Sequence, residues 1–110
     1  MSINQELITA LVTLDGFSKE NVVPDVYTGT KNKFIAFNIA DERGVVCDDS
    51  ATENVISIQV HLFLPLNENY FNIKDLIKTK LVSIGYSYPV VSQMIDDDKR
   101  HLIFECEKVI

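Results

Sequence analysis

Residues 55–64 alternate between apolar and polar or aromatic side chains, and this pattern constrains the fold more than any other part of the chain. The apolar set, spaced two residues apart, is Ile56, Ile58, Val60, Leu62 and Leu64. Because successive side chains of a strand point to opposite faces of a sheet, the alternation predicts a long strand with one face buried. Pro65 ends this strand, since it has no N–H to donate to a neighbouring strand. The fold must therefore contain a sheet with one face covered by other elements.

A first segment with helical periodicity can provide part of that cover. Ser2 and Gln5 form a capping-box pattern at its start. Gly16 can adopt the left-handed conformation that ends a helix, so a helix is predicted over residues 2–15. Its apolar stripe consists of Ile3, Leu7, Leu11 and Leu14.

A second helix is predicted between Asn72, as its N-cap, and Gly85. Asp75 lies near the positive end of its dipole, which favours this start. The stripe expected to face the sheet is Ile73, Leu76, Ile77, Leu81 and Ile84. A helix that directly follows a long strand is expected to cover the buried face of that strand.

Three further strands complete the predicted sheet. Residues 33–40 carry apolar side chains on both faces, which indicates a strand that is central or covered by a partner. Residues 86–94 and 100–109 predict a final hairpin. Its inward set is Leu102, Phe104 and Cys106, and its solvent-exposed set includes His101, Glu105 and Glu107. Residues 17–33 lack periodicity and predict an extended loop.

The resulting order, αββαββ, predicts a single α+β domain over residues 1–110. Its sheet is expected to be mainly antiparallel, with about four strands and both helices packed on one face. A length of 110 residues is typical of one domain, and four glycines and three prolines leave no room for a linker.

The connection formed by residues 41–54 is the strongest candidate for a functional surface. Its carboxylates are Asp41, Glu42, Asp48, Asp49 and Glu53. Connections of this length without structure of their own are uncommon in compact domains and are often functional or mobile. Two interpretations stay open: a solvated charged loop, or a recognition segment that orders on contact with a partner.

The charge balance argues against several classes of partner. Sixteen acidic and ten basic residues give a net charge of -6, which opposes binding to phosphate backbones. No apolar run approaches the ~20 residues of a membrane span, and the N-terminus lacks the features of a secretion signal, so we expect a cytoplasmic protein without membrane contact. Cys47 and Cys106 have no His or second Cys at ligand spacing, so both are expected to be free thiols.

No pattern in the chain predicts catalysis, a metal site or a cofactor. Residues 96–98, all aspartates, lack the alternate spacing and central glycine of a calcium loop and are interpreted as a hairpin turn. His61 and His101 have no nucleophile or further ligand at a suitable spacing, and a cross-strand pairing of His101 with a carboxylate is expected only to stabilise. Glu105 and Glu107 could suit acid–base chemistry, but a solvated sheet edge accounts for both.

Five segments, taken in order along the chain, carry a likeness to a known family. They are Tyr27-Thr28-Gly29-Thr30, Phe34-Ile35-Ala36-Phe37-Asn38, Gln59-Val60-His61-Leu62-Phe63, Ile73-Lys74-Asp75-Leu76-Ile77 with Gly85-Tyr86, and Arg100-His101-Leu102-Ile103-Phe104-Glu105. Together they resemble the tail terminator, or tail completion, family of long-tailed bacteriophages. The likeness covers nearly the whole chain but contains no short diagnostic motif, and some small head–tail joining proteins share this size and style.

The resemblance implies a structural virion protein and no enzyme activity. A subunit of this family assembles into a ring, usually hexameric, on the last ring of the tail tube, stops tube polymerisation and offers a surface for head–tail joining. The implied partners are copies of the chain, the major tail tube protein and the head–tail connector protein. The implied location is the head–tail interface of the virion, and the host cytoplasm during assembly. A negatively charged ring would let packaged DNA pass through its lumen without specific binding.

Two other interpretations remain open at this point. One is a small prophage-encoded regulatory or ligand-binding module without catalysis, which gene neighbourhood would separate from a tail protein. The other is an enzyme of unrecognised type, which a deep pocket with convergent polar groups would favour.

Overall fold

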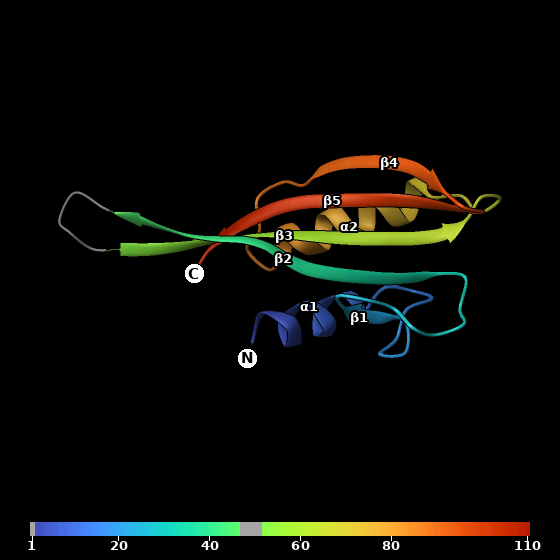
Figure 1. The fold of residues 1–110 in the computed structure, drawn as a ribbon, viewed down its shortest axis with the longest axis horizontal. Helices are drawn as coiled ribbons and strands as arrows, with labels where there is room; N and C mark the ends of the chain where they lie inside the picture. The colour runs from blue at the N-terminus through green and yellow to red at the C-terminus, as the bar shows by residue number, and fades with distance from the viewer. Residues whose placement is uncertain (1, 47–51) are drawn as a thin grey trace.

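The described residues, 2–46 and 52–110 of a computed structural model, form a five-stranded sheet with two helices on one face (Figure 1). In chain order the elements are α1 (Ile3–Leu11), β1 (Val22–Pro24), β2 (Phe34–Val46), β3 (Thr52–Pro65), α2 (Phe71–Ser83), β4 (Val90–Asp96) and β5 (Lys99–Val109). The strands lie in the order β1-β2-β3-β5-β4; β1 is parallel to β2, and the other neighbours are antiparallel. The predicted α+β class and mainly antiparallel sheet are confirmed.

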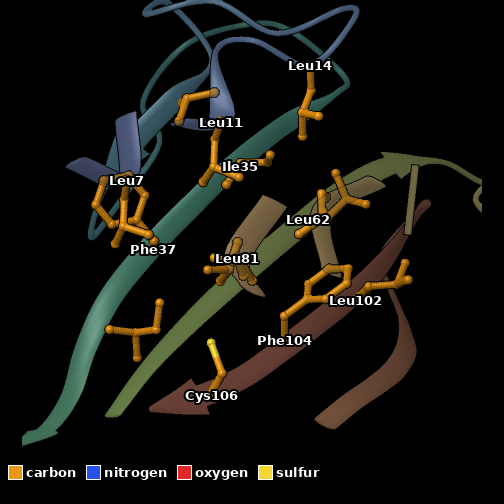
Figure 2. Packing of buried hydrophobic residues seen from close by; sticks show 14 of the residues in the cluster. Leu7, Leu11, Leu14, Ile35, Phe37, Leu62, Leu81, Leu102, Phe104 and Cys106 are labelled. Carbon is orange, nitrogen blue, oxygen red and sulfur yellow. The ribbon is translucent and has the colours of Figure 1, made fainter. Parts of the chain in front are cut away.

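The buried core confirms the alternation of β3. All five of its predicted inward residues are at most 1% exposed. The inward set of β5 is also buried, as predicted: Leu102, Phe104 and Cys106. Figure 2 shows these side chains beside those of α1 and α2, and both helices contribute to the same cluster. Burying a large apolar side chain contributes about 1.5–3 kcal/mol, so β3 and its neighbours provide most of the driving force for folding.

The helix α1 begins as predicted and ends early. The Ser2 hydroxyl accepts a hydrogen bond from the Gln5 N–H at 3.1 Å, and the Gln5 side-chain carbonyl accepts one from the Ser2 N–H at 3.0 Å. The helix ends at Leu11, four residues before the predicted end, and turns lead from there to Gly16, whose φ is 88°. Leu14 stays buried although it lies beyond the helix.

The strand β1 corrects the prediction of a loop over residues 17–33. It is three residues long and aligns Val22 with Ile35 and Pro24 with Phe37. A strand this short offers no periodicity to detect, which is why the sequence predicted about four strands and the structure has five.

Asn21, which is 2% exposed, anchors the approach to β1. Its Nδ2 donates to the carbonyls of Gly16 at 3.1 Å and Lys33 at 3.0 Å, and its Oδ1 accepts from the Ser18 N–H at 2.8 Å. Its own carbonyl accepts from the Ile35 N–H at 2.8 Å. One residue therefore satisfies backbone groups of two segments, residues 16–18 and 33–35, and holds them together.

The helix α2 covers the sheet through a stripe narrower than predicted. Ile73, Ile77 and Leu81 are buried, but Leu76 is 42% exposed, so its expected place in the core is wrong. At about 100° per residue, Leu76 points about 100° away from the centre of that stripe. The predicted N-cap is also wrong. The cap is Tyr70, which makes no side-chain capping bond, and Asn72 lies inside the helix.

The final hairpin confirms the predicted turn and corrects one face. Asp97 occupies the turn with a φ of 57°, in the left-handed region that Asp tolerates. Glu105 and Glu107 are exposed, as predicted. His101 is 8% exposed, so its predicted place at the wet edge is wrong. Its ring is covered by Phe63 of β3, whose centroid lies 4.0 Å away.

The predicted connection over residues 41–54 is a two-stranded arm in the described residues. The pairing of β2 with β3 continues from Asp41 opposite Ser57 to Val46 opposite Thr52, beyond a bulge between Ile39 and Asp41. The bulge shifts the register of β2 by one residue, and the pairing of β2 with β3 continues beyond the core. Figure 1 shows this arm extending to the left of the helices, and the molecule measures 53 × 25 × 22 Å. The prediction of an unstructured loop is therefore wrong for these residues.

Candidate functional site

The predicted acidic site residues lie on the arm wherever the structure describes them. Asp41 and Glu42 belong to β2 and Glu53 to β3, and all three are exposed. Asp48 and Asp49 lie outside the described residues. The arm thus carries carboxylates on two paired strands.

Arg43 neutralises part of this acidic surface. Its guanidinium donates to Glu107 of β5 at 3.0 Å and to Asp41 at 3.4 Å. The hydrogen bond with Glu107 is the first cause that raises the pKa of Arg43 above its ordinary value. All three side chains are about half exposed, so the contribution of these ion pairs to stability is small. Their effect is geometric, because Arg43 ties the base of the arm to β5.

The sheet has two open edges among the described residues. The strand β1 pairs with β2 only from Ile35 to Phe37, so the outer side of β2 has no neighbouring strand beyond that point. At the opposite side, β4 is the last strand. Open edges present unpaired backbone donors and acceptors to other chains.

The hydrogen-bond phase identifies the backbone groups that face outward on β4. The Ile35 N–H donates to the Asn21 carbonyl, and the Phe37 carbonyl accepts from the Asp25 N–H. Both groups therefore face the β1 side of β2. Antiparallel strands alternate between pairs that exchange hydrogen bonds and pairs that do not. Following the registers across the sheet, Ser92 bonds with Ile103 of β5. The backbone N–H and carbonyl groups of Val91, Gln93 and Ile95 therefore face away from β5.

The sheet face opposite the helices carries a row of aromatic rings. Tyr27 stacks on Phe34 with centroids 4.3 Å apart, and Phe34 stacks on Phe63 at 4.6 Å. Phe63 stacks in turn on His101 at 4.0 Å, and Met94 lies opposite His101 on β4. No helix or strand of the described residues covers this row, although its members shield one another.

Beside the aromatic row, two histidines form a hydrogen-bonded pair. His61 Nδ1 lies 2.8 Å from His101 Nε2, and His61 Nε2 lies 3.3 Å from the side-chain oxygen of Gln59. His101 Nδ1 is buried, lacks a hydrogen-bond partner and faces Asp96 at 3.9 Å. Desolvation is the first cause that lowers the pKa of both imidazoles, and it is opposed by Glu105 at His61 and by Asp96 at His101. The predicted approach of His101 to a carboxylate across strands is thus observed, whereas the pairing of the two histidines was not predicted.

The hollows that the described residues form are open to solvent. The hollow beside α1 has a volume of about 560 Å³, opens to solvent, and is lined by Gln5, Ile8, Thr9, Lys19 and Val22. Within the described residues, no three His, Cys, Asp or Glu side chains are placed to hold a metal ion. Cys106 is a buried free thiol, and burial raises its pKa to about 12. Cys47 lies outside the described residues.

The comparisons with known proteins do not assign the chain to a family. No protein-family model matches it, and no curated protein matches it significantly. None of the helices in residues 2–46 and 52–110 is long and apolar enough to cross a membrane. The arm, the two open edges and the face around the histidine pair are therefore the features on which a functional proposal depends.

Proposed function

We propose that this protein is a structural subunit of a phage or prophage virion. In this proposal it assembles as a ring on the end of the tail tube, ends tube polymerisation and provides the surface for head–tail joining. The sequence resemblance suggests this role, and the projecting arm is the structural observation that carries it. The arm places exposed carboxylates beyond the body of the molecule, where another subunit or partner protein can reach them.

The arm contributes little to the stability of its own subunit. Among the residues whose burial the structure describes, the buried cluster contains none between Phe37 and Ile56, and residues 41–44, 53 and 54 are exposed. A two-stranded ribbon without a packed face is marginal in water. An arm of this kind is consistent with a segment that becomes stable through contacts in an assembly.

The open edges support assembly with copies of the same chain. The free side of β2, beyond its short pairing with β1, and the free side of β4 lie on opposite sides of the sheet. Pairing of unlike edges between successive subunits is a head-to-tail contact, which closes into a ring when the rotation permits it. Both edges provide backbone hydrogen bonds without requiring a cofactor.

The mass of the protein in solution tests whether the chain assembles into a ring. Native mass spectrometry of the purified protein, alone and mixed with purified tail tubes, should show a closed oligomer of one size in at least one of the two conditions. Gln93→Pro removes an outward N–H of β4 and should weaken assembly at least tenfold. Gln93→Thr keeps that N–H and serves as the matched control. A protein that stays monomeric in both conditions, and does not bind tubes, would contradict the proposal and favour the regulatory or ligand-binding module.

A shortened arm tests the joining surface separately. Arg43 and Val55 are paired at a position where the strands exchange hydrogen bonds, so replacing residues 44–54 with Asn-Gly connects them through a two-residue hairpin turn. The variant should keep its melting temperature within a few degrees, because the removed residues whose burial the structure describes are all exposed. It should fail to join heads to tails in a mixing assay scored by electron microscopy. Normal joining by this variant would remove the arm from the proposal.

A further inference from the structure

The chain from Gln59 through His61 and His101 to Asp96 crosses three strands of the uncovered sheet face, and its protons can be placed from its geometry. The oxygen of Gln59 accepts, so the facing His61 Nε2 carries a proton. A neutral imidazole has one N–H, so His61 Nδ1 is an acceptor and His101 Nε2 donates to it across 2.8 Å. This leaves His101 Nδ1 without a proton, buried, and 3.9 Å from the carboxylate of Asp96.

We propose that the pair of His61 and His101 is a proton switch. The pair binds one proton without losing its hydrogen bond, and a second proton forces the two rings apart. The first proton binds to His101 Nδ1, where the new N–H points toward Asp96 and the pair keeps its hydrogen bond. The second can only bind to His61 Nδ1, which already accepts the bond from His101. Two N–H groups would then face each other across a hydrogen-bond distance, and two positive charges would share one site.

The surrounding charges place one carboxylate beside each imidazole, so the limit of one proton comes from the two nitrogens that face each other across 2.8 Å. Glu105 of β5 acts on His61, and Asp96 of β4 acts on His101. The neighbouring positions of β2 are Phe34 and Ala36, which carry no charge. Lys99 of β5 is on the same face, and its ammonium pairs with Asp98 at 3.2 Å.

The consequence of the second proton is local. His101 links β5 to Phe63 of β3 by stacking and to Met94 of β4 by register, so separating the rings loosens the face at the β3–β5–β4 junction. Acidification would therefore change both the charge and the packing of this surface. This inference does not depend on ring assembly.

The sign of the pH dependence follows from the direction of the shifts. Both imidazoles have a pKa below their ordinary value of 6.5 in the folded chain, so the unfolded chain binds more protons as pH falls. The contribution of the pair to stability is thus complete above about pH 6.5 and is lost as pH falls through the two titration steps of the folded pair. Because the sites are coupled, these steps belong to the pair and not to either residue.

Nitrogen-15 NMR of the imidazoles in the full chain tests the proposal. We expect a scalar coupling between His61 Nδ1 and His101 Nε2, its retention after the first proton, its loss after the second, and two titration steps separated by at least one pH unit. Asp96→Asn, at an exposed position that should not affect folding, should lower the pH of the first step and keep the coupling. Asp97→Asn in the adjacent turn is the matched control and should leave both steps in place. Absence of the coupling, or titration of both rings in one step, would overturn the proposal.

Discussion

Replacing Asn21 with alanine should destabilise the protein more than any other removal of a polar side chain. The substitution leaves the Gly16 and Lys33 carbonyls and the Ser18 N–H without their side-chain partner. Each such bond contributes about 0.5–1.5 kcal/mol net, and water can reach part of the site after truncation, so we expect a loss of about 2–4 kcal/mol. For a domain of this size that corresponds to a fall in melting temperature of about 8–16 °C.

Urea unfolding followed by circular dichroism measures this loss directly. The slope of the unfolding free energy against urea concentration should stay unchanged while the midpoint falls, because the substitution does not change the compactness of the folded or the unfolded state. Asn4→Ala, at an exposed position of α1, is the matched control and should change stability by less than about 0.5 kcal/mol. Asn21→Asp has nearly the same shape but turns a carboxylate toward two carbonyls, so it should cost at least as much as alanine. A nearly neutral Asn21→Asp would refute the hydrogen-bond argument and leave packing as the only contribution of Asn21 to stability.

Three further predictions concern the core. Leu81→Ala should cost about 2–5 kcal/mol, whereas Leu76→Ala should cost less than about 1 kcal/mol, since Leu81 is fully buried and Leu76 is 42% exposed; equal losses in thermal melts would contradict the assigned helix face. Val60→Asp places a carboxylate where the native side chain is 0% exposed and should prevent folding at pH 7, so a native circular dichroism spectrum would count against the burial of β3. In a Cys47→Ser variant, Cys106 should react with a thiol reagent at pH 8 only after denaturation, because burial raises its pKa to about 12; fast labelling of this variant in its native state would show the strand to be open.

The parts of the fold that face the core were predictable because burial leaves a periodic signal. The strict alternation of β3 and the capping box of Ser2 and Gln5 each specified an element before its neighbours were known. The error at Leu76 arose because a helix has more apolar residues than its contact stripe needs, and only the packing shows which of them face the sheet.

The arm and the histidine pair leave no comparable signal. Residues 41–44, 53 and 54 of the arm are exposed and carry no apolar alternation, and the arm pairs because the register of β2 with β3 continues past the bulge between Ile39 and Asp41. His61 and His101 lie forty positions apart and meet only because β3 pairs with β5 in one register. Knowing that register, one would find both residues on the face opposite the core; a single sequence does not supply it.

Tail length in the absence of this protein tests its proposed role most directly. Deleting its gene from the parent phage or prophage and measuring tails by electron microscopy should show a broad, abnormal length distribution and tails without heads. Supplying the wild-type chain in trans should restore uniform, joined tails, and the shortened-arm variant should restore length control without joining. Tails of normal length joined to heads in the deletion strain would contradict the account.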